Sequence, residues 1–168
     1  CVILRIPSNR FGRAAIAILA IATVLYVVPA AAAPQVTGVR VGVYPGKTRI
    51  VLDVTGTVKF SSFVLPQPYR VVVDLSEVTW SPGLRNPPKG GLVTGMRFGL
   101  FKPGSSRVVL DSTGPVRVAN AFMIPPAGKN RSYRLVVDIA KTSKQAFLMA
   151  YKRPDRRPVA KRTAGGVL

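Results

Sequence analysis

Apolar and polar residues alternate with a period of two in short runs through the middle of the chain. In residues 36–44, Val39, Val41 and Val43 alternate with charged, small or aromatic neighbours, and residues 93–101 repeat the alternation. Successive side chains of a strand point to opposite faces, so this period predicts half-buried β-strands. Pro-Gly, Thr-Gly and proline-rich pieces separate the runs, which places turns between the strands.

The runs form two copies of one unit, with the motifs in the same order in both. Three pairs of segments match: VTGVRVGVY at 36–44 with VTGMRFGLF at 93–101, PGKTRIVLD at 45–53 with PGSSRVVLD at 103–111, and YRVVVDL at 69–75 with YRLVVDI at 133–139. The repeated pattern predicts four strands in each copy. Their ranges are 37–44, 48–54, 59–65 and 69–75, then 94–101, 106–111, 117–124 and 133–139.

The expected fold class is all-β, a sandwich of two pseudo-symmetric four-stranded antiparallel sheets. One sheet is expected from each copy, residues 36–75 and 93–139, because two sheets that each have one apolar face bury those faces on each other. The connector at 81–91 is too rich in proline and glycine for a strand. The phenylalanines of the strand-like runs are expected in the core: Phe60, Phe63, Phe98 and Phe122.

The first 33 residues have the three parts of a secretory signal. Arg5, Arg10 and Arg13 precede an apolar stretch at 14–28, and small residues follow, so cleavage is expected after Ala32. The alternative is an uncleaved membrane anchor, since the apolar length approaches the roughly 20 residues that span a bilayer. A helix is expected over 14–28. Both interpretations place the rest of the chain outside the cytoplasm.

The chain has 25 lysines and arginines against 6 acidic residues, a formal net charge of +19. The expected sandwich domain, residues 34–140, holds 14 basic and 5 acidic residues, and residues 141–168 form a basic segment with two prolines, interpreted as a linker or tail. A field of this size favours anionic partners. An exported domain does not meet genomic DNA, so no nucleic-acid partner is expected, while anionic lipid and an acidic wall polymer remain.

One pattern of arginine, apolar, valine, apolar and aspartate occurs four times, at 49–53, 70–74, 107–111 and 134–138. On a strand, the arginine, valine and aspartate share one face. If two such strands pair antiparallel, an arginine lies near an aspartate of its neighbour. Two interpretations stay open: ion pairs on a solvated sheet, or guanidinium groups held upright for an anionic ligand. The candidate ligand contacts of this kind are Arg49, Arg70, Arg107 and Arg134.

Arg40 and Arg97 lack a matching aspartate within their own strands, so they are the stronger candidates for free ligand contacts. Tyr44 and Phe101 occupy equivalent positions next to a turn, on the same face as the charged residues. Exposed aromatic rings offer apolar faces on which sugar rings stack, so both are candidate glycan contacts. Trp80, beside the connector, is a weaker candidate of the same kind.

No catalytic residue is expected. The chain has no histidine and one cysteine, Cys1, so Ser-His-Asp and Cys-His arrangements and histidine-based zinc sites cannot form. Most carboxylates lie within the fourfold pattern, each near an arginine, which leaves no tuned acid-base pair. No phosphate-binding GxxxxGK[ST] loop occurs, and one cysteine excludes an internal disulfide. Neither a metal site nor a cofactor is expected in this chain.

With these motifs the chain resembles the AMIN domain. The resemblance rests on the order and duplication of segments such as VTGVRVGVY, KTRIVLDV and PYRVVVDL, and it covers about residues 35–140. It implies two symmetric four-stranded sheets, peptidoglycan binding, a periplasmic location and delivery of an attached N-acetylmuramoyl-L-alanine amidase to the division septum. In such amidases a zinc hydrolase domain with His and Glu ligands follows, and nothing here matches it. The chain is therefore expected to be a non-catalytic N-terminal part of a longer amidase.

Three functions remain open at this point. The first is a wall-binding targeting module, with peptidoglycan as the partner and divisome or other envelope proteins as further candidates. The second is an accessory domain of an outer-membrane secretion or pilus machine. The third is a binder of polyanions or anionic membranes that is driven by charge alone. In the first two, the membrane is contacted only through the N-terminal segment.

Overall fold

The computed structural model describes residues 32–84 and 87–152. The fold described below belongs to the unit Ala33–Leu168. The helix predicted over residues 14–28 lies outside the described residues. Within the described ranges, no helix has the length and the apolar character needed to cross a membrane.

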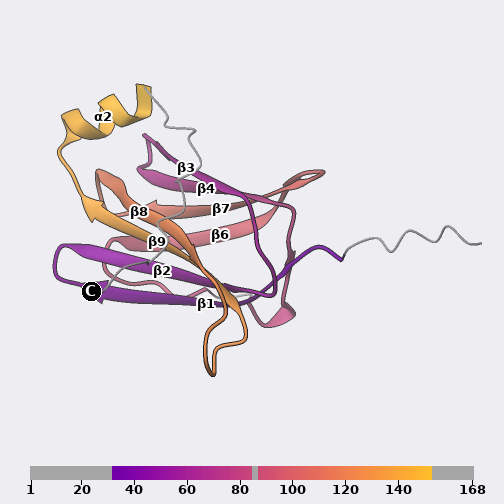
Figure 1. The fold of residues 1–168 in the computed structure, drawn as a ribbon. Coiled ribbons are helices and arrows are strands. Elements are labelled where there is room, and N and C mark those ends of the chain that lie inside the picture. Colours follow the sequence, from indigo (N-terminus) through magenta and orange to yellow (C-terminus); the bar gives the residue numbers. More distant parts are fainter. Residues whose placement is uncertain (1–31, 85–86, 153–168) are drawn as a thin grey trace, which may run out of the picture. The chain divides into compact units, whose positions relative to one another are not determined.

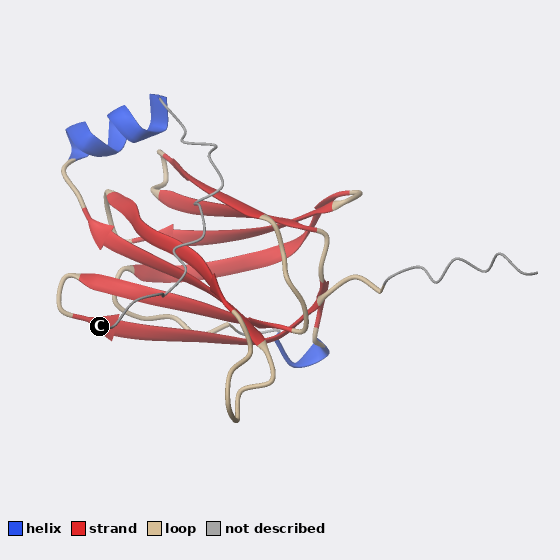
Figure 2. Cartoon of the chain, viewed as in Figure 1, coloured by secondary structure: helices blue, strands red, loops and turns tan. Residues whose placement is uncertain are grey.

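This unit is a β-sandwich of two sheets with one α-helix beside them (Figures 1 and 2). The five-stranded sheet has the strand order β5-β1-β2-β9-β8, and the four-stranded sheet has the order β3-β4-β7-β6. The elements are β1 (Gln35–Tyr44), β2 (Lys47–Val54), β3 (Phe60–Leu65), β4 (Arg70–Ser76), β5 (Thr79–Trp80), the 3₁₀ turn η1 (Pro82–Leu84), β6 (Val93–Lys102), β7 (Ser105–Ser112), β8 (Val116–Ile124), β9 (Tyr133–Lys141) and α2 (Lys144–Lys152).

The predicted all-β sandwich is confirmed, and all eight predicted strands form within two residues of their expected ends. Strand pairs are antiparallel except for β5, which adds two residues in parallel to the start of β1. This short strand makes the first sheet five-stranded rather than four-stranded. The alternation of apolar and polar residues, the turn motifs and the repeat were sufficient to locate these eight strands, because the two faces of each strand differ in polarity.

The prediction that each copy builds one sheet is wrong. β1 and β2 share a sheet with β9 and β8, while β3 and β4 share the other with β7 and β6. Each sheet therefore takes half of its repeated strands from each copy. Equivalent strands still occupy equivalent places, so the pseudo-two-fold exchanges the two sheets. The four strands with the arginine–aspartate pattern have the same order of polar and apolar residues. Antiparallel pairing would bring an arginine opposite an aspartate whether the two strands come from one copy or from both. The pattern therefore does not determine which strands pair.

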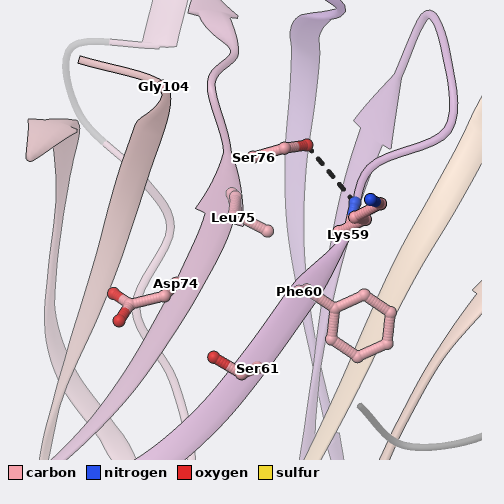
Figure 3. A pocket seen from close by; sticks show the side chains of 7 residues that line it. All are labelled: Lys59, Phe60, Ser61, Asp74, Leu75, Ser76 and Gly104. Atoms are coloured by element: carbon pink, nitrogen blue, oxygen red, sulfur yellow. Dashed lines mark hydrogen bonds between the residues drawn. The ribbon is translucent and has the colours of Figure 1, made fainter. Parts of the chain in front are cut away.

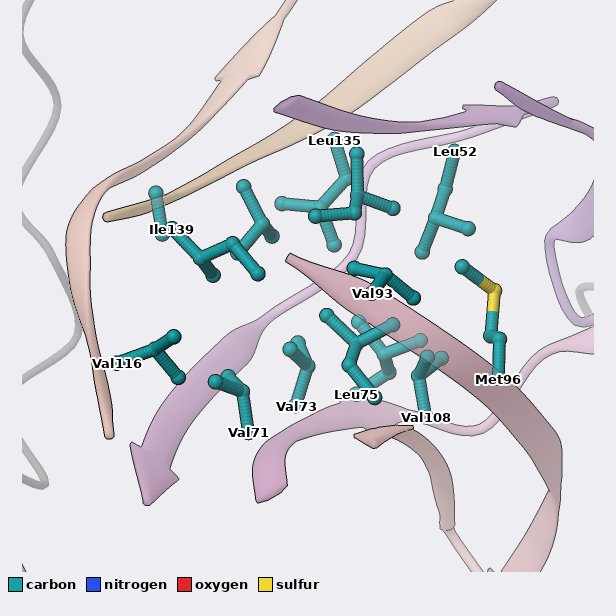
Figure 4. Packing of buried hydrophobic residues seen from close by; sticks show 14 of the residues in the cluster. Leu52, Val71, Val73, Leu75, Val93, Met96, Val108, Val116, Leu135 and Ile139 are labelled. Atoms are coloured by element: carbon teal, nitrogen blue, oxygen red, sulfur yellow. The ribbon is translucent and has the colours of Figure 1, made fainter. Parts of the chain in front are cut away.

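The core lies between the two sheets and is built from the apolar positions of the fourfold pattern. Ile50 and Leu52 of β2 are each 2% exposed, and the equivalent residues of β4, β7 and β9 are buried with them. Figure 4 shows these side chains meeting from opposite layers. The labelled members from the central strands are Leu52, Val71, Val73, Leu75, Val108, Leu135 and Ile139.

Two of the four phenylalanines expected in the core pack against it, namely Phe60 and Phe98. The prediction is wrong for the other two. Phe63 lies opposite Val72 and Phe122 lies opposite Val136, and directly opposed residues of an antiparallel pair share one face. The neighbours of these valines along each strand point into the core, so Phe63 and Phe122 lie half-buried on the outer faces, at equivalent positions of the two sheets.

The basic segment interpreted as a linker begins with structure that the sequence did not indicate. Residues Lys144–Lys152 form α2, whose N-terminus is capped by Ser143: its Oγ accepts a hydrogen bond from the Ala146 amide at 3.1 Å. Phe147 is completely buried, and its ring meets the Tyr69 ring edge-on at 5.0 Å. α2 contacts β3 and β8, so it covers the open edge where the outer strands of the two sheets meet. The linker interpretation is therefore wrong for this helix.

We expect Phe147→Ala to lower the free energy of unfolding by about 3–5 kcal/mol, because it leaves a cavity at a fully buried aromatic site. Met149→Ala is the matched control on the same helix, since Met149 is 62% exposed. Urea unfolding followed by circular dichroism measures both variants. Equal effects would show that α2 is not docked through Phe147.

Candidate ligand-binding site

Bidentate arginine–aspartate pairs join the two copies at the centre of each sheet. Arg49 of β2 donates from Nε and Nη2 to Asp138 of β9, at 2.7 and 2.8 Å. Arg107 of β7 donates in the same way to Asp74 of β4, at 2.6 and 3.0 Å. In each pair the strand register places the arginine directly opposite the aspartate, and the two pairs occupy equivalent positions in the two sheets. The expected cross-strand pairing is therefore present, and it connects different copies.

The two central pairs differ in burial. Asp138 is 1% exposed, whereas Asp74 is 27% exposed at the side chain. The hydrogen bond from Arg49 holds the pKa of Asp138 below its usual value, against the opposing effect of burial, and Lys47 adds to this lowering. The same hydrogen bond raises the pKa of Arg49. The five-stranded sheet thus contains the more deeply buried charge pair.

Arg40 and Arg97 are not free, which corrects the expectation from their own strands. Arg40 Nη2 lies 2.6 Å from Asp53 Oδ1, and Arg97 Nη2 lies 2.8 Å from Asp111 Oδ1. The partner carboxylate comes from the neighbouring strand, which a pattern within one strand cannot show. Both arginines still have exposed side chains, at 60% and 64%. Each makes one hydrogen bond to its aspartate, which leaves further N–H donors for a ligand.

The other two arginines of the fourfold pattern, Arg134 and Arg70, form no ion pair within the described residues. Arg134 stands opposite Asp53 in register, yet within the described residues no carboxylate pairs with it. Its Nε is buried and has no hydrogen-bond partner in the described part of the chain. The equivalent Arg70 stands opposite Asp111 and instead donates from Nε to the Pro68 carbonyl at 3.3 Å.

A shallow hollow lies on the outer face of each sheet, at equivalent positions. The first, here called the Tyr44 hollow, has a volume of about 270 Å³ and is lined by Arg40, Gly42, Tyr44, Arg49, Val51 and Arg134, among others. The second, the Phe101 hollow, has a volume of about 260 Å³ and is lined by Arg97, Gly99, Phe101, Arg107 and Val109, among others. The sequence analysis missed the glycines, although the repeat offers the signal: VGVY and FGLF place a glycine between arginine and aromatic in both copies.

The aromatic residues sit differently over the two hollows. The Phe101 ring centroid lies 3.5 Å from Arg107 Cζ, so ring and guanidinium are stacked. The Tyr44 ring centroid lies 5.9 Å from Arg49 Cζ and 5.6 Å from Lys47 Nζ, which leaves the guanidinium uncovered. Tyr44 and Phe101 are both exposed. Trp80, the weaker candidate, instead stacks on Phe98 against the core and lines neither hollow.

A third hollow, of about 360 Å³, lies where β3 and β4 approach the β6–β7 turn at Gly104 (Figure 3). It includes Asp74, whose carboxylate is already bound by Arg107. Ser76 Oγ accepts a hydrogen bond from the Lys59 amide there, at 3.3 Å. None of the predicted ligand contacts lines it. Its one cation without an ion pair in the described part of the chain is Lys59, and no arginine or exposed aromatic ring lines it.

The profile of the AMIN domain matches residues 38–124. The chain belongs to the AMIN domain family. It is 31% identical over 112 residues to the N-acetylmuramoyl-L-alanine amidase AmiC of Neisseria meningitidis serogroup B, and 30% identical over 114 residues to AmiC of Escherichia coli O6:H1. These matches cover 64% and 65% of this chain but only 26% and 27% of the relatives. The AMIN chain thus spans about a quarter of the length of the amidases it matches.

The acidic side chains of the described residues are spread apart and mostly paired with arginines. No three histidine, cysteine, aspartate or glutamate side chains gather anywhere in residues 32–84 and 87–152. Four of the aspartates are bound by arginines instead, as the ion pairs above show. The outer faces are built to hold arginines in place.

We expect Asp138→Asn to lower the free energy of unfolding by about 3 kcal/mol, because it leaves the Arg49 guanidinium without its buried partner. Asp74→Asn is the matched control at the equivalent position and should cost about 1 kcal/mol, since that pair is more exposed to water. Urea unfolding at neutral pH measures both. A larger loss for Asp74→Asn would contradict the difference in burial.

The Arg49–Asp138 pair should make the unfolding free energy of the domain depend on pH in the acid range. The folded-state pKa of Asp138 lies below its unfolded value near 3.8, so the unfolded state takes up the proton first. The pair therefore contributes its full stability above pH 3.8 and loses it as the pH falls through the lower, folded-state pKa. The difference in unfolding free energy between the wild-type chain and Asp138→Asn should shrink below pH 3.8. A difference that stays constant with pH would contradict this assignment.

Proposed function

We propose that this AMIN domain is a non-catalytic module that binds peptidoglycan through the outer faces of its sheets. The observation that supports this most is the repeated combination of fixed guanidinium groups, an exposed aromatic ring and a glycine-floored hollow on each face. Peptide stems of the wall have carboxylates, which the planar arginine fork suits. Glycan strands offer sugar faces for Tyr44 and Phe101. Binding of this kind needs no metal and no cofactor.

We further propose that the chain serves a longer, exported N-acetylmuramoyl-L-alanine amidase. Its two relatives bear that name and extend well beyond the matched region. The amide hydrolysis would belong to the part of such a protein outside this chain. Residues 1–33 would direct export to the periplasm, as a cleaved signal or an anchor. The module would then concentrate the amidase on the wall, and at the division septum in particular, by adding a second binding contact to the enzyme.

Charge alone is the competing explanation, because residues 34–140 hold 14 basic residues against 5 acidic ones. A charge-driven interaction depends on how many cations are exposed and is screened by salt. A face-specific interaction depends on where the cations stand. The two explanations therefore differ in the effect of removing equal charge from the sheets and from the C-terminal side of the domain.

We expect Arg40→Ala combined with Arg97→Ala to weaken co-sedimentation with insoluble peptidoglycan sacculi several-fold. Lys141→Ala with Lys144→Ala is the matched control, since it removes the same charge from exposed positions outside both hollows. The melting temperature should change little in either case, because exposed ion pairs contribute at most about 1 kcal/mol. Equal losses from both double variants would defeat the face-specific proposal and favour the charge-driven one.

A further inference from the structure

The two outer faces are built from equivalent strands but have different charge balances, and β6 has a register shift between Leu100 and Lys102 that β1 lacks. Three arginines line the Tyr44 hollow, and the carboxylates paired with them number two, Asp53 with Arg40 and Asp138 with Arg49. Arg134 is the cation in excess. In the Phe101 hollow the lining arginines are two, Arg97 and Arg107, and each has its own aspartate. Only the Tyr44 hollow has a guanidinium left over for an anion.

Arg134 is also the residue with an unmet bonding requirement. Its Nε is buried and finds no acceptor in the described part of the chain. A buried donor without a partner costs free energy, so this side chain is the one in the hollow whose bonding within the domain is incomplete. The equivalent donor on the other sheet, Arg70 Nε, already bonds the Pro68 carbonyl, and Arg70 does not line the Phe101 hollow.

The aromatic rings strengthen the difference between the faces. Phe101 lies flat against Arg107 at 3.5 Å and so covers the face of that guanidinium. The Tyr44 ring centroid lies 5.9 Å from Arg49 Cζ, and its ring and hydroxyl lie over Gly42, where a Cβ would be 3.0 Å from the ring and 3.4 Å from the hydroxyl oxygen. An anion entering the Tyr44 hollow therefore meets uncovered guanidinium groups beside an aromatic wall.

We propose that the Tyr44 hollow binds a single carboxylate of the wall peptide, and that the Phe101 hollow does not bind an anion. The carboxylate pairs with the Arg134 guanidinium, which lines the hollow and has no carboxylate partner in the described part of the chain, while Arg40 and Arg49 add positive charge and Tyr44 closes one side. The inference rests on the proposed wall-binding function and assigns only its anion contact to one of the two outer faces, while the exposed Phe101 ring remains a sugar contact. The fork of a guanidinium fits the two oxygens of a carboxylate in one plane.

Two matched glycines provide a test that leaves the charge unchanged. Gly42→Val places a side chain on the floor of the Tyr44 hollow, where even a Cβ would lie 3.0 Å from the exposed Tyr44 ring. Gly99→Val does the same in the Phe101 hollow, where a Cβ would meet nothing within 4 Å. Valine suits a strand at both positions. We expect Gly42→Val to weaken binding of the purified chain to sacculi and to a soluble stem peptide about tenfold, and Gly99→Val to change it less than twofold.

Arginine side-chain NMR reports on Arg134 directly. The Nε–H resonance of Arg134, assigned through its loss in Arg134→Lys, should shift when a stem peptide with free carboxylates is added. The Arg70 Nε–H resonance is the internal control and should stay in place. The same peptide with its carboxylates amidated, and inorganic phosphate at equal concentration, should leave Arg134 unshifted.

The outcomes separate this inference from the proposed function. A wild-type chain that fails to sediment with sacculi would overturn both. Retained wild-type binding with equal losses from Gly42→Val and Gly99→Val would overturn only the assignment to the Tyr44 hollow. A phosphate-induced shift as large as that caused by the peptide would overturn the carboxylate assignment. Thermal melting of both glycine variants checks that each remains folded. Arg134→Lys keeps the positive charge but removes the planar guanidinium that pairs with a carboxylate.

Discussion

The bidentate pairing of arginine with aspartate across β2–β9 and β4–β7 is the interaction on which the rest of the sandwich depends. These four strands occupy the middle of the two sheets, and each comes from a different copy than its central neighbour. Their apolar residues alternate with the charged ones and form the core between the layers. The same four strands thus form the ion pairs with their outer faces and the core with their inner faces. Because each sheet needs strands from both copies, neither copy completes a sheet by itself.

This exchange also explains how one symmetric scaffold supports two unlike faces. The pseudo-two-fold places Arg40 with Arg97, Tyr44 with Phe101, and Arg134 with Arg70. The strands are equivalent except for a register shift in β6 beside Phe101, so the two faces differ both in the aromatic side chain and in the backbone that positions it. A phenylalanine that stacks on its arginine covers the cation, whereas a tyrosine that stands away leaves it open. Divergence after duplication therefore needs few substitutions to separate a binding face from a supporting one.

Helix α2 covers one open edge of the sandwich. A sandwich of two sheets leaves an open edge where the outer strands β3 and β8 approach each other. The buried Phe147 side chain fills that edge and contacts Tyr69, which directly precedes β4.

The sequence by itself determined the eight repeated strands and their duplicated order, because side-chain alternation in a strand is a local property, but it placed Phe63 and Phe122 on the wrong face. It also identified the arginines and aromatics of the outer faces, since period two places Arg49, Tyr44 and their equivalents on one side. Strand partnership was decided only by the tertiary structure, because the fourfold pattern fits pairing within a copy and between copies alike. The pairing of Arg40 with Asp53, the isolation of Arg134 and the burial of Phe147 follow from that choice. Each is a contact between residues distant in sequence, and no local pattern encodes which of several suitable partners is reached.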